Sequence, residues 1–210
     1  MNGNFANSGN ITGGVYGFYV GSDLVGNFGN SGNISGGLYG VYIESEMTGN
    51  FANSGNISGA KYYGVYVDSN LNGNFTNSGN ISGGYYGVYI GSKLNGNFTN
   101  TSDISGGKYG VWIGSDMTGD FVNSGNITGS AYYGVTIASK LNGNFTNTGN
   151  ITGGNYGVVV YSDLNGNFTN TGNITGSGST VSISTETWPA TSTIAATSLA
   201  ATMACMSVTI

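Results

Sequence analysis

The tripeptide Gly-Asn-Phe, or a close copy of it, recurs eight times along this chain of 210 residues. Its phenylalanines follow one another at steps of 23 or 24 residues, and they are Phe5, Phe28, Phe51, Phe75, Phe98, Phe121, Phe145 and Phe168. A period this regular predicts one short structural unit stacked on itself, so that equivalent residues form columns along the stack. We therefore expect any functional site to follow a column as well.

The composition excludes several classes of protein before any motif is considered. The chain has 40 glycines and one proline, which fits neither a packed helical protein nor collagen, where glycine occupies every third position. Its four basic residues are all lysines, so it lacks the basic patch that nucleic-acid binding requires. The single cysteine, Cys205, excludes an intramolecular disulfide and a metal site built from several cysteines.

Within one coil, residues 71–93, the apolar residues alternate as they do in strands. Leu71, Phe75 and Ile81 share one parity, and Val88 and Ile90 form a second alternating pair after a glycine. Alternation interrupted by glycine and asparagine predicts about three short strands in each coil. Stacking the coils at the roughly 4.8 Å spacing of paired strands makes a continuous core. The sequence thus predicts an all-β parallel β-helix (β-solenoid) of about seven coils over residues 1–176, followed by a tail without the repeat.

Two further apolar columns accompany the phenylalanines, and we expect both to lie in the core. One is isoleucine in every coil, namely Ile11, Ile34, Ile57, Ile81, Ile104, Ile127, Ile151 and Ile174. The other is leucine or methionine, namely Leu24, Met47, Leu71, Leu94, Met117, Leu141 and Leu164. Each large apolar side chain that becomes buried stabilises the fold by roughly 1.5 to 3 kcal/mol, which offsets the ordering of glycine-rich turns.

An asparagine occupies one column without exception. Its members are Asn7, Asn30, Asn53, Asn77, Asn100, Asn123, Asn147 and Asn170. Asparagine tolerates a left-handed backbone, and stacked amides form hydrogen bonds with one another. We therefore expect this column to be structural, with the stacked amides holding the corners of the coils.

Both steps of 24 residues carry their extra residue at the same place. The longer segments are residues 59–64 and 129–134, whereas the other coils are shorter there, as in residues 36–40. Length variation confined to one place predicts an exposed turn that leaves the core unchanged.

Residues 77–83 read Asn-Ser-Gly-Asn-Ile-Ser-Gly, and residues 86–90 read Tyr-Gly-Val-Tyr-Ile. This pattern resembles the repeats in passenger domains of bacterial autotransporter adhesins and in related pectin-lyase-like β-helices, over residues 1 to about 176. The resemblance implies a rod that is displayed on, or released from, a Gram-negative cell surface as an adhesin, an aggregation factor or a stalk. It implies an extracellular or outer-membrane location, and as partner a glycan or protein of a host or neighbouring cell, or another copy. A signal peptide and a C-terminal translocator barrel are missing from the pattern, so we expect a fragment or another export route.

Carboxylates are too isolated for catalysis. Enzymes of the β-helix class that cleave polysaccharides need clustered carboxylates with a base or an arginine beside them. Asp116 and Asp120 are close in sequence, as are Glu44 and Glu46, but neither pair has a cationic neighbour in its own coil. The sequence therefore predicts a protein without enzymatic activity or cofactor, and a glycan-active β-helix enzyme remains an alternative.

One column carries most of the charges. It reads Asp23, Glu46, Asn70, Lys93, Asp116, Lys140 and Asp163. A calcium solenoid needs an oxygen ligand from each successive coil, and two lysines would repel the ion. We therefore expect no metal here, and instead predict ion pairs between successive coils at an exposed corner, each contributing about 0.2 to 1 kcal/mol.

An aromatic column is the candidate binding site. Between the inward residues of the Val-x-Ile strand it reads Tyr19, Tyr42, Tyr66, Tyr89 and Trp112, and it continues as Thr136 and Val159. Parity predicts that all of these residues face outward. A second aromatic column begins three residues earlier, at Tyr16, and we expect it on the same face. Exposed aromatic surface either binds glycans, proteins or a second copy, or stabilises the sheet by stacking between neighbouring coils.

A hydroxyl-bearing strand gives a rival hypothesis. Thr76, Ser78 and Ser82 form a nearly uncharged array of the kind that an ice-binding solenoid uses. Against this, the outward column is irregular, because Ala6 and Gly29 occupy positions that later coils fill with threonine. Ice binding is therefore an alternative to the aromatic site.

Residues 177–210 depart from the repeat and are rich in threonine, serine and alanine. From Thr187 onward this tail has no charged residue, but its many hydroxyls and Pro189 make a poor membrane-spanning helix. We expect the tail to cap the rod or to be disordered, and we do not expect it to span a membrane.

Overall fold

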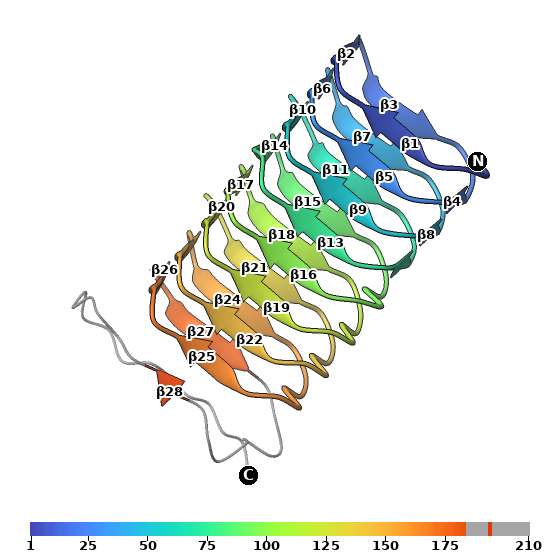
Figure 1. Ribbon diagram of the computed structural model, residues 1–210. Helices are drawn as coiled ribbons and strands as arrows, with labels where there is room; N and C mark the ends of the chain where they lie inside the picture. The colour runs from blue at the N-terminus through green and yellow to red at the C-terminus, as the bar shows by residue number, and fades with distance from the viewer. Residues whose placement is uncertain (184–192, 195–210) are drawn as a thin grey trace.

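The computed structural model describes residues 1–183 and 193–194, and these residues form an all-β parallel β-solenoid. The chain makes about eight turns, one more than the sequence predicts, and the described part contains no helix. The coils stack into a rod, with β1 (Phe5–Asn7) at one end and β25 (Phe168–Asn170) toward the other (Figure 1). The predicted fold class is therefore confirmed.

Three long parallel sheets run along the rod. The phenylalanine sheet contains β1 (Phe5–Asn7), β5 (Phe28–Asn30), β9 (Phe51–Asn53), β13 (Phe75–Asn77), β16 (Phe98–Asn100), β19 (Phe121–Asn123), β22 (Phe145–Asn147), β25 (Phe168–Asn170) and β28 (Thr193–Ile194). The isoleucine sheet contains β2 (Asn10–Gly13), β6 (Asn33–Gly36), β10 (Asn56–Gly59), β14 (Ile81–Gly83), β17 (Asp103–Gly106), β20 (Asn126–Gly129), β23 (Asn150–Gly153) and β26 (Asn173–Gly176). The tyrosine sheet contains β3 (Tyr16–Val20), β7 (Tyr39–Ile43), β11 (Tyr63–Val67), β15 (Tyr86–Ile90), β18 (Tyr109–Ile113), β21 (Tyr133–Ile137), β24 (Tyr156–Val160) and β27 (Ser179–Ile183).

A short fourth sheet closes each coil at the leucine corner. Its strands are β4 (Leu24–Val25), β8 (Met47–Thr48) and β12 (Leu71–Asn72). Single parallel bridges continue this sheet from Leu71 through Leu94, Met117 and Leu141 to Leu164. The predicted leucine and methionine column therefore lies at this corner, and all seven of its side chains are buried.

Each strand pairs with its equivalent in the next coil, so like residues become neighbours. In the pairing of β9 with β13, Phe51 lies opposite Phe75. Their rings stack with centroids 4.7 Å apart and planes 3° apart. From Phe28 to Phe168 every phenylalanine of the column is fully buried, and the isoleucine column is buried from Ile34 onward. The columns predicted from the period therefore form the core.

A tight arc joins the isoleucine sheet to the tyrosine sheet, and glycine makes it possible. A Cβ added to Gly83 would lie 1.8 Å from the carbonyl oxygen of Tyr86, so no other residue fits without a shift of the backbone. The two longer coils place their additional residues in this arc, where Ala60 and Ser130 are exposed. The insertion site is thus the exposed turn that the sequence predicts.

Strand pairing continues beyond residue 176. Val181 of β27 pairs with Val158 of β24, and β28 pairs with β25. The expectation that residues 177–210 form a cap or are disordered concerns mainly residues 184–192 and 195–210, which lie outside the described residues. In the described ranges no helix has the length and apolarity needed to cross a membrane.

Candidate interaction face

The outer side of the tyrosine sheet carries two adjacent columns of aromatic rings, which we call the aromatic face. One ring starts each of the first seven strands, and this starting column is Tyr16, Tyr39, Tyr63, Tyr86, Tyr109, Tyr133 and Tyr156. The other column, the ladder, is Tyr19, Tyr42, Tyr66, Tyr89 and Trp112. Within a coil the two columns are in contact, because the centroids of Tyr63 and Tyr66 are 4.6 Å apart and those of Tyr86 and Tyr89 are 5.2 Å apart. Both columns therefore lie on one face, although three residues separate them in sequence.

A buried glycine lets both rings of a coil face outward. Gly64 follows Tyr63, and the register passes from the Tyr63–Tyr86 pair to the Val65–Val88 pair without pairing this glycine. A Cβ on Gly64 would lie 2.6 Å from Ile81 Cγ2 and 2.6 Å from the carbonyl oxygen of the equivalent glycine in the next coil. Because only glycine fits, the strand breaks its alternation here, and rings three residues apart reach the same side.

In the middle coils the rings of neighbouring coils cover one another's faces, whereas Tyr42 and Tyr66 meet edge to face at 69°. Tyr66 and Tyr89 are parallel within 5° with centroids 5.0 Å apart, and Tyr86 and Tyr109 are parallel within 9° at 4.7 Å. Within a coil the two rings are nearly perpendicular from the third to the fifth coil, at 75° for Tyr86 and Tyr89, whereas in the first two coils they are stacked, at 17° for Tyr39 and Tyr42. Tyr19 at the first coil is 47% exposed, whereas the other ladder residues are half-buried. The aromatic face therefore presents ring edges and hydroxyls rather than open ring faces.

The aromatic rings of the ladder end after Trp112, and the next two residues of the column keep its register but are covered. Thr136 and Val159 occupy the next two positions of the column, but their exposed fractions are 0% and 5%. Tyr133 changes orientation at this point, because its plane makes 73° with Tyr109, and a hydrogen bond joins Tyr133 to Tyr161. The hydroxyl of Thr136 has no hydrogen-bond partner in the described structure.

The two edges of the aromatic face carry opposite charges. At the edge where the strands begin, the Lys61 amine lies 5.2 Å from the ring centroid of Tyr62, and the Lys108 amine lies 4.1 Å from that of Tyr85. Both distances permit cation–π attraction. At the edge where the strands end, Glu44 and Asp68 follow β7 and β11 directly. The sequence reasoning missed the two lysines as a set, although they occupy nearly the same place two coils apart.

Two tyrosine hydroxyls bind the carboxylates of the acidic edge. Tyr19 donates a hydrogen bond to Glu44 Oε2 of the following coil, and Tyr66 donates to Asp68 Oδ1 over 2.5 Å. A carboxylate that accepts such a bond keeps further lone pairs that face solvent. Both carboxylates are therefore held at the margin of the ladder and stay accessible.

The hydroxyls of Tyr42, Tyr66 and Tyr86 keep their protons at neutral pH, because the pKa of each is raised. Burial raises the pKa of Tyr42 and of Tyr86 to about 12. Burial also raises the pKa of Tyr66, and the hydrogen bond to Asp68 raises it further. The centre of the face is therefore an uncharged array of hydroxyls that both donate and accept hydrogen bonds.

The asparagine column forms the predicted amide ladder in the interior. Each Nδ2 donates to the Oδ1 of the asparagine in the next coil, over 2.7 to 2.8 Å from Asn7 to Asn170. Each Nδ2 also donates to the carbonyl oxygen two residues later, as Asn77 does to Gly79 over 2.6 Å. The members of the column from Asn77 to Asn147 are fully buried. The amide ladder is therefore a structural element that links every coil to the next by hydrogen bonds.

These asparagines do not use the left-handed backbone that asparagine tolerates. Among the described residues a positive φ occurs only at glycines, namely Gly3, Gly26 and Gly49. The corner uses the asparagine side chain, which satisfies a turn carbonyl and the neighbouring amide, and it does not use left-handed geometry. A buried amide with every partner present is stabilising, whereas a buried amide without partners is costly.

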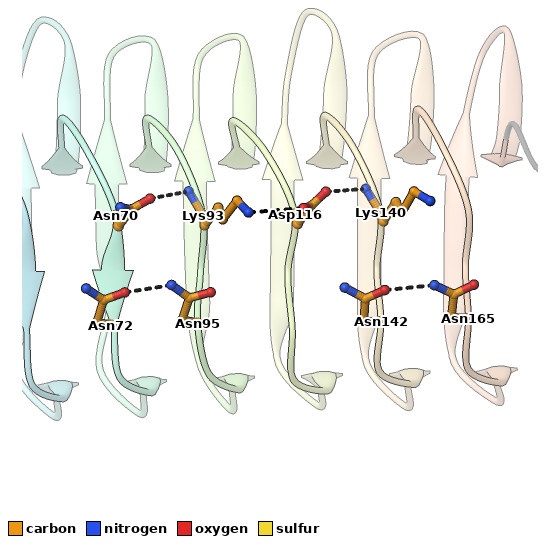
Figure 2. Close-up of polar contacts among 8 residues, drawn as sticks. All are labelled: Asn70, Asn72, Lys93, Asn95, Asp116, Lys140, Asn142 and Asn165. Atoms are coloured by element: carbon orange, nitrogen blue, oxygen red, sulfur yellow. Dashed lines mark hydrogen bonds and ion pairs between the residues drawn. The ribbon is translucent and has the colours of Figure 1, made fainter.

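The charged column forms a chain of contacts at the leucine corner (Figure 2). Asn70 Oδ1 accepts the backbone N–H of Lys93, whose Nζ lies 3.5 Å from Asp116 Oδ2. Asp116 Oδ1 in turn accepts the backbone N–H of Lys140, and the Lys140 amine lies 3.1 Å from Asp163. The predicted ion pairs between coils are therefore present. Exposed pairs of this kind contribute about 0.2 to 1 kcal/mol each.

A shallow hollow of about 400 Å³ lies on the outer side of the phenylalanine sheet. It is lined by small residues of the first four coils, including Ala6, Gly29 and Ala52. These residues replace the threonines that occupy the same column in later coils, so the hydroxyl array is interrupted here. No group of three or more metal-ligating side chains occurs in the described part of the chain.

The chain matches no protein-family model, no curated protein and no solved structure at a significant level. The fold and the asparagine ladder are therefore established by the structure alone. No family match supports the resemblance to autotransporter and pectin-lyase-like repeats.

Proposed function

We propose that this β-solenoid is a non-catalytic structural or adhesive rod, and that it binds a glycan, a protein or a second copy through the aromatic face. One observation carries the proposal: seven successive coils present aromatic rings on one outer surface, with their edges and hydroxyls turned to solvent. Such rings are rigid, so they bury area at a low cost in side-chain entropy, and their hydroxyls provide hydrogen bonds. The repeat resemblance adds a location, on or released from a bacterial cell surface.

The ring geometry limits the kind of binding. Because Tyr66, Tyr89 and their neighbours cover one another's faces at about 5.0 Å, a sugar ring has no open face to stack on in the middle coils. A partner therefore meets ring edges and neutral hydroxyls, flanked by two lysines and two carboxylates. This surface suits a polar, hydroxyl-rich or protein partner.

The two alternatives receive less support from specific residues. An ice-binding surface needs a regular hydroxyl array, and the hollow at Ala6, Gly29 and Ala52 interrupts that array over the first three coils. For a glycan-active enzyme, the cation beside Asp116 is Lys93, at 3.5 Å, and the two form an exposed ion pair like that of Lys140 and Asp163. We therefore place the aromatic face first.

The test compares the wild-type chain with a variant in which Tyr42, Tyr66, Tyr89 and Trp112 are replaced by threonine. Threonine is suitable because Thr136 already occupies this column in a later coil. Binding is measured on a glycan array, on protein-coated surfaces and as self-association, with circular dichroism to check the fold. We expect the variant to remain rich in β-structure and to lose binding.

A matched control carries four substitutions on the opposite side of the rod. In this control, threonines of the phenylalanine sheet become alanine, namely Thr76, Thr99, Thr146 and Thr169. The control should bind like the wild type. If the ladder variant binds as well as the control, or if the wild type binds nothing in any format, the aromatic face has a purely structural role and the proposal is wrong.

A further inference from the structure

We propose that two copies of this chain associate through their aromatic faces with the rods parallel, related by a two-fold axis along the rod. This inference rests on the proposed function and selects a second copy as the partner of the aromatic face. Its basis is the opposite charge of the two edges of that face.

The charges at the edges are not neutralised within the chain. Among the described residues, the ion pairs are those of Lys93 and Lys140, both at the leucine corner. Among these described residues, Lys61 and Lys108 have no carboxylate within ion-pairing distance, and their amines lie over tyrosine rings instead. A desolvated surface with uncompensated charges on both edges is costly to bury unless the partner supplies the opposite sign.

The charges give the face a direction. Lys61 lies two residues before β11 (Tyr63–Val67), and Asp68 follows the last residue of the same strand. Lys108 lies directly before β18 (Tyr109–Ile113), and Glu44 directly follows β7 (Tyr39–Ile43). Strand β11 therefore runs from a lysine to an aspartate, and the lysine before β18 and the glutamate after β7 give the two edges of the face the same signs.

Symmetry then selects one arrangement of two copies. A two-fold axis along the rod reverses the strand direction of the second copy and keeps the coils at the same height, so the basic edge of each copy meets the acidic edge of the other. Lys61 of each copy then faces Asp68 of the second copy across the same coil. A two-fold axis along the strands instead makes the rods antiparallel and brings lysine against lysine. Charge complementarity therefore favours the parallel pair.

The size of the face indicates a weak dimer. Five-residue strands span about 17 Å, and seven coils span about 34 Å, which gives each copy about 600 Å² of flat contact. Two such surfaces bury about 1,200 Å², the lower end of the range for specific protein interfaces. We therefore expect a dimer that forms at micromolar concentration and weakens as salt screens the edges.

The experiment uses two charge-reversal variants of the full chain. One is Lys61→Glu with Lys108→Glu, and the other is Glu44→Lys with Asp68→Lys. Sedimentation equilibrium over a range of protein and salt concentrations measures self-association of the wild type, of each variant and of mixtures. Circular dichroism and urea unfolding confirm that each variant folds, and all four positions lie at the edge of the solenoid, outside the buried core.

A control variant reverses no edge charge but has the same net charge as the lysine variant. It places four glutamates on alternate coils of the outer side of the isoleucine sheet, at Ser35, Ser82, Thr128 and Thr175. We expect it to dimerise like the wild type. Each edge variant should associate at least about tenfold more weakly, and an equimolar mixture of the two should dimerise again, because one variant is acidic at both edges and the other is basic at both.

Three results would overturn the inference. The first is a wild type that stays monomeric throughout the concentration range. The second is an edge variant that dimerises as well as the control. The third is a chain carrying all four charge reversals that pairs with the wild type instead of with itself, because this is the signature of antiparallel rods. A monomer that still binds glycan or protein through the ladder refutes the dimer and leaves the proposed function standing.

Discussion

Replacing Asn77 by alanine should destabilise the rod more than any surface substitution of comparable size. Asn77 Oδ1 accepts a hydrogen bond from Asn53 over 2.8 Å, and Asn77 Nδ2 donates to Asn100 over 2.8 Å and to Gly79 over 2.6 Å. The residue is fully buried, so water does not replace these partners. Three lost bonds at about 1 kcal/mol each, together with the desolvated groups left unpaired, give a loss of about 3 to 5 kcal/mol.

An exposed column of asparagines provides a matched control for the buried amide ladder. Asn150 is an exposed asparagine that also makes hydrogen bonds to both neighbouring coils, over 2.8 Å with Asn126 and 2.9 Å with Asn173. Because solvent replaces those partners, Asn150→Ala should cost about 1 kcal/mol or less. The free energies of unfolding are measured by urea denaturation followed by circular dichroism. If the two alanine variants unfold at the same urea concentration, the argument that burial makes the amide ladder of Asn77 structural is wrong.

A third variant tests the same reasoning through pH. Asn77→Asp places a carboxylate, which only accepts hydrogen bonds, opposite the acceptors of Asn100 and Gly79. The folded state therefore raises the pKa of the introduced carboxyl above its unfolded value of about 3.9. Stability relative to the wild type is then greatest at low pH, where the group is protonated and donates one bond, and it is lost as the pH rises through the folded-state pKa. A constant difference between pH 3 and pH 7 would contradict this mechanism.

Three further predictions concern separate parts of the rod. Gly87→Ala should lower the free energy of unfolding by about 2 kcal/mol or more in urea denaturation, because the added Cβ would lie 2.6 Å from Ile104 Cγ2. Lys93→Met should cost about 1 kcal/mol or less in the same measurement, and the loss should vanish in 1 M salt, since the pair is exposed. In an alkaline absorbance titration, Tyr42 and Tyr86 should ionise near pH 12, later than in the denatured chain. Because their folded-state pKa is raised above the ordinary value of about 10, the stability they contribute is complete below about pH 10 and is lost as the pH rises toward 12. Ionisation of every tyrosine near pH 10 in the folded chain would refute this.

The fold was predictable because stacking brings residues that are one repeat apart in sequence into direct contact. Phe51 and Phe75 are 24 residues apart, and they pair because the register aligns each coil with the next. The insertion at residues 59–64 did not obscure this, since the arc holds the extra residue outside the core. Column membership alone therefore assigns the phenylalanine and isoleucine residues to the interior.

The details of the aromatic face were less predictable, because they depend on side-chain orientation. Parity indicates that Tyr89 faces outward, but it does not indicate that Tyr66 covers its ring. Parity also assigns Thr136 to the outward column, but it does not indicate that this residue is fully buried, where Tyr133 turns and forms a hydrogen bond with Tyr161. The rotamers of large rings settle which outward position is accessible, and a single sequence contains no direct record of them.

The coils contact only their neighbours, and the covalent chain runs around the rod while the hydrogen bonds run along it. Strands β1 and β27 lie at opposite ends of this stack (Figure 1). A pulling force applied between those ends acts along the hydrogen bonds and loads the terminal coil first, because each coil is held only by the one beside it. The rod therefore opens under tension as a series of separate releases. Each release frees one repeat of 23 or 24 residues, about 80 Å of extended chain. Under load the molecule yields by successive lengthening, and the coils that have not yet opened keep their amide ladder and their aromatic face.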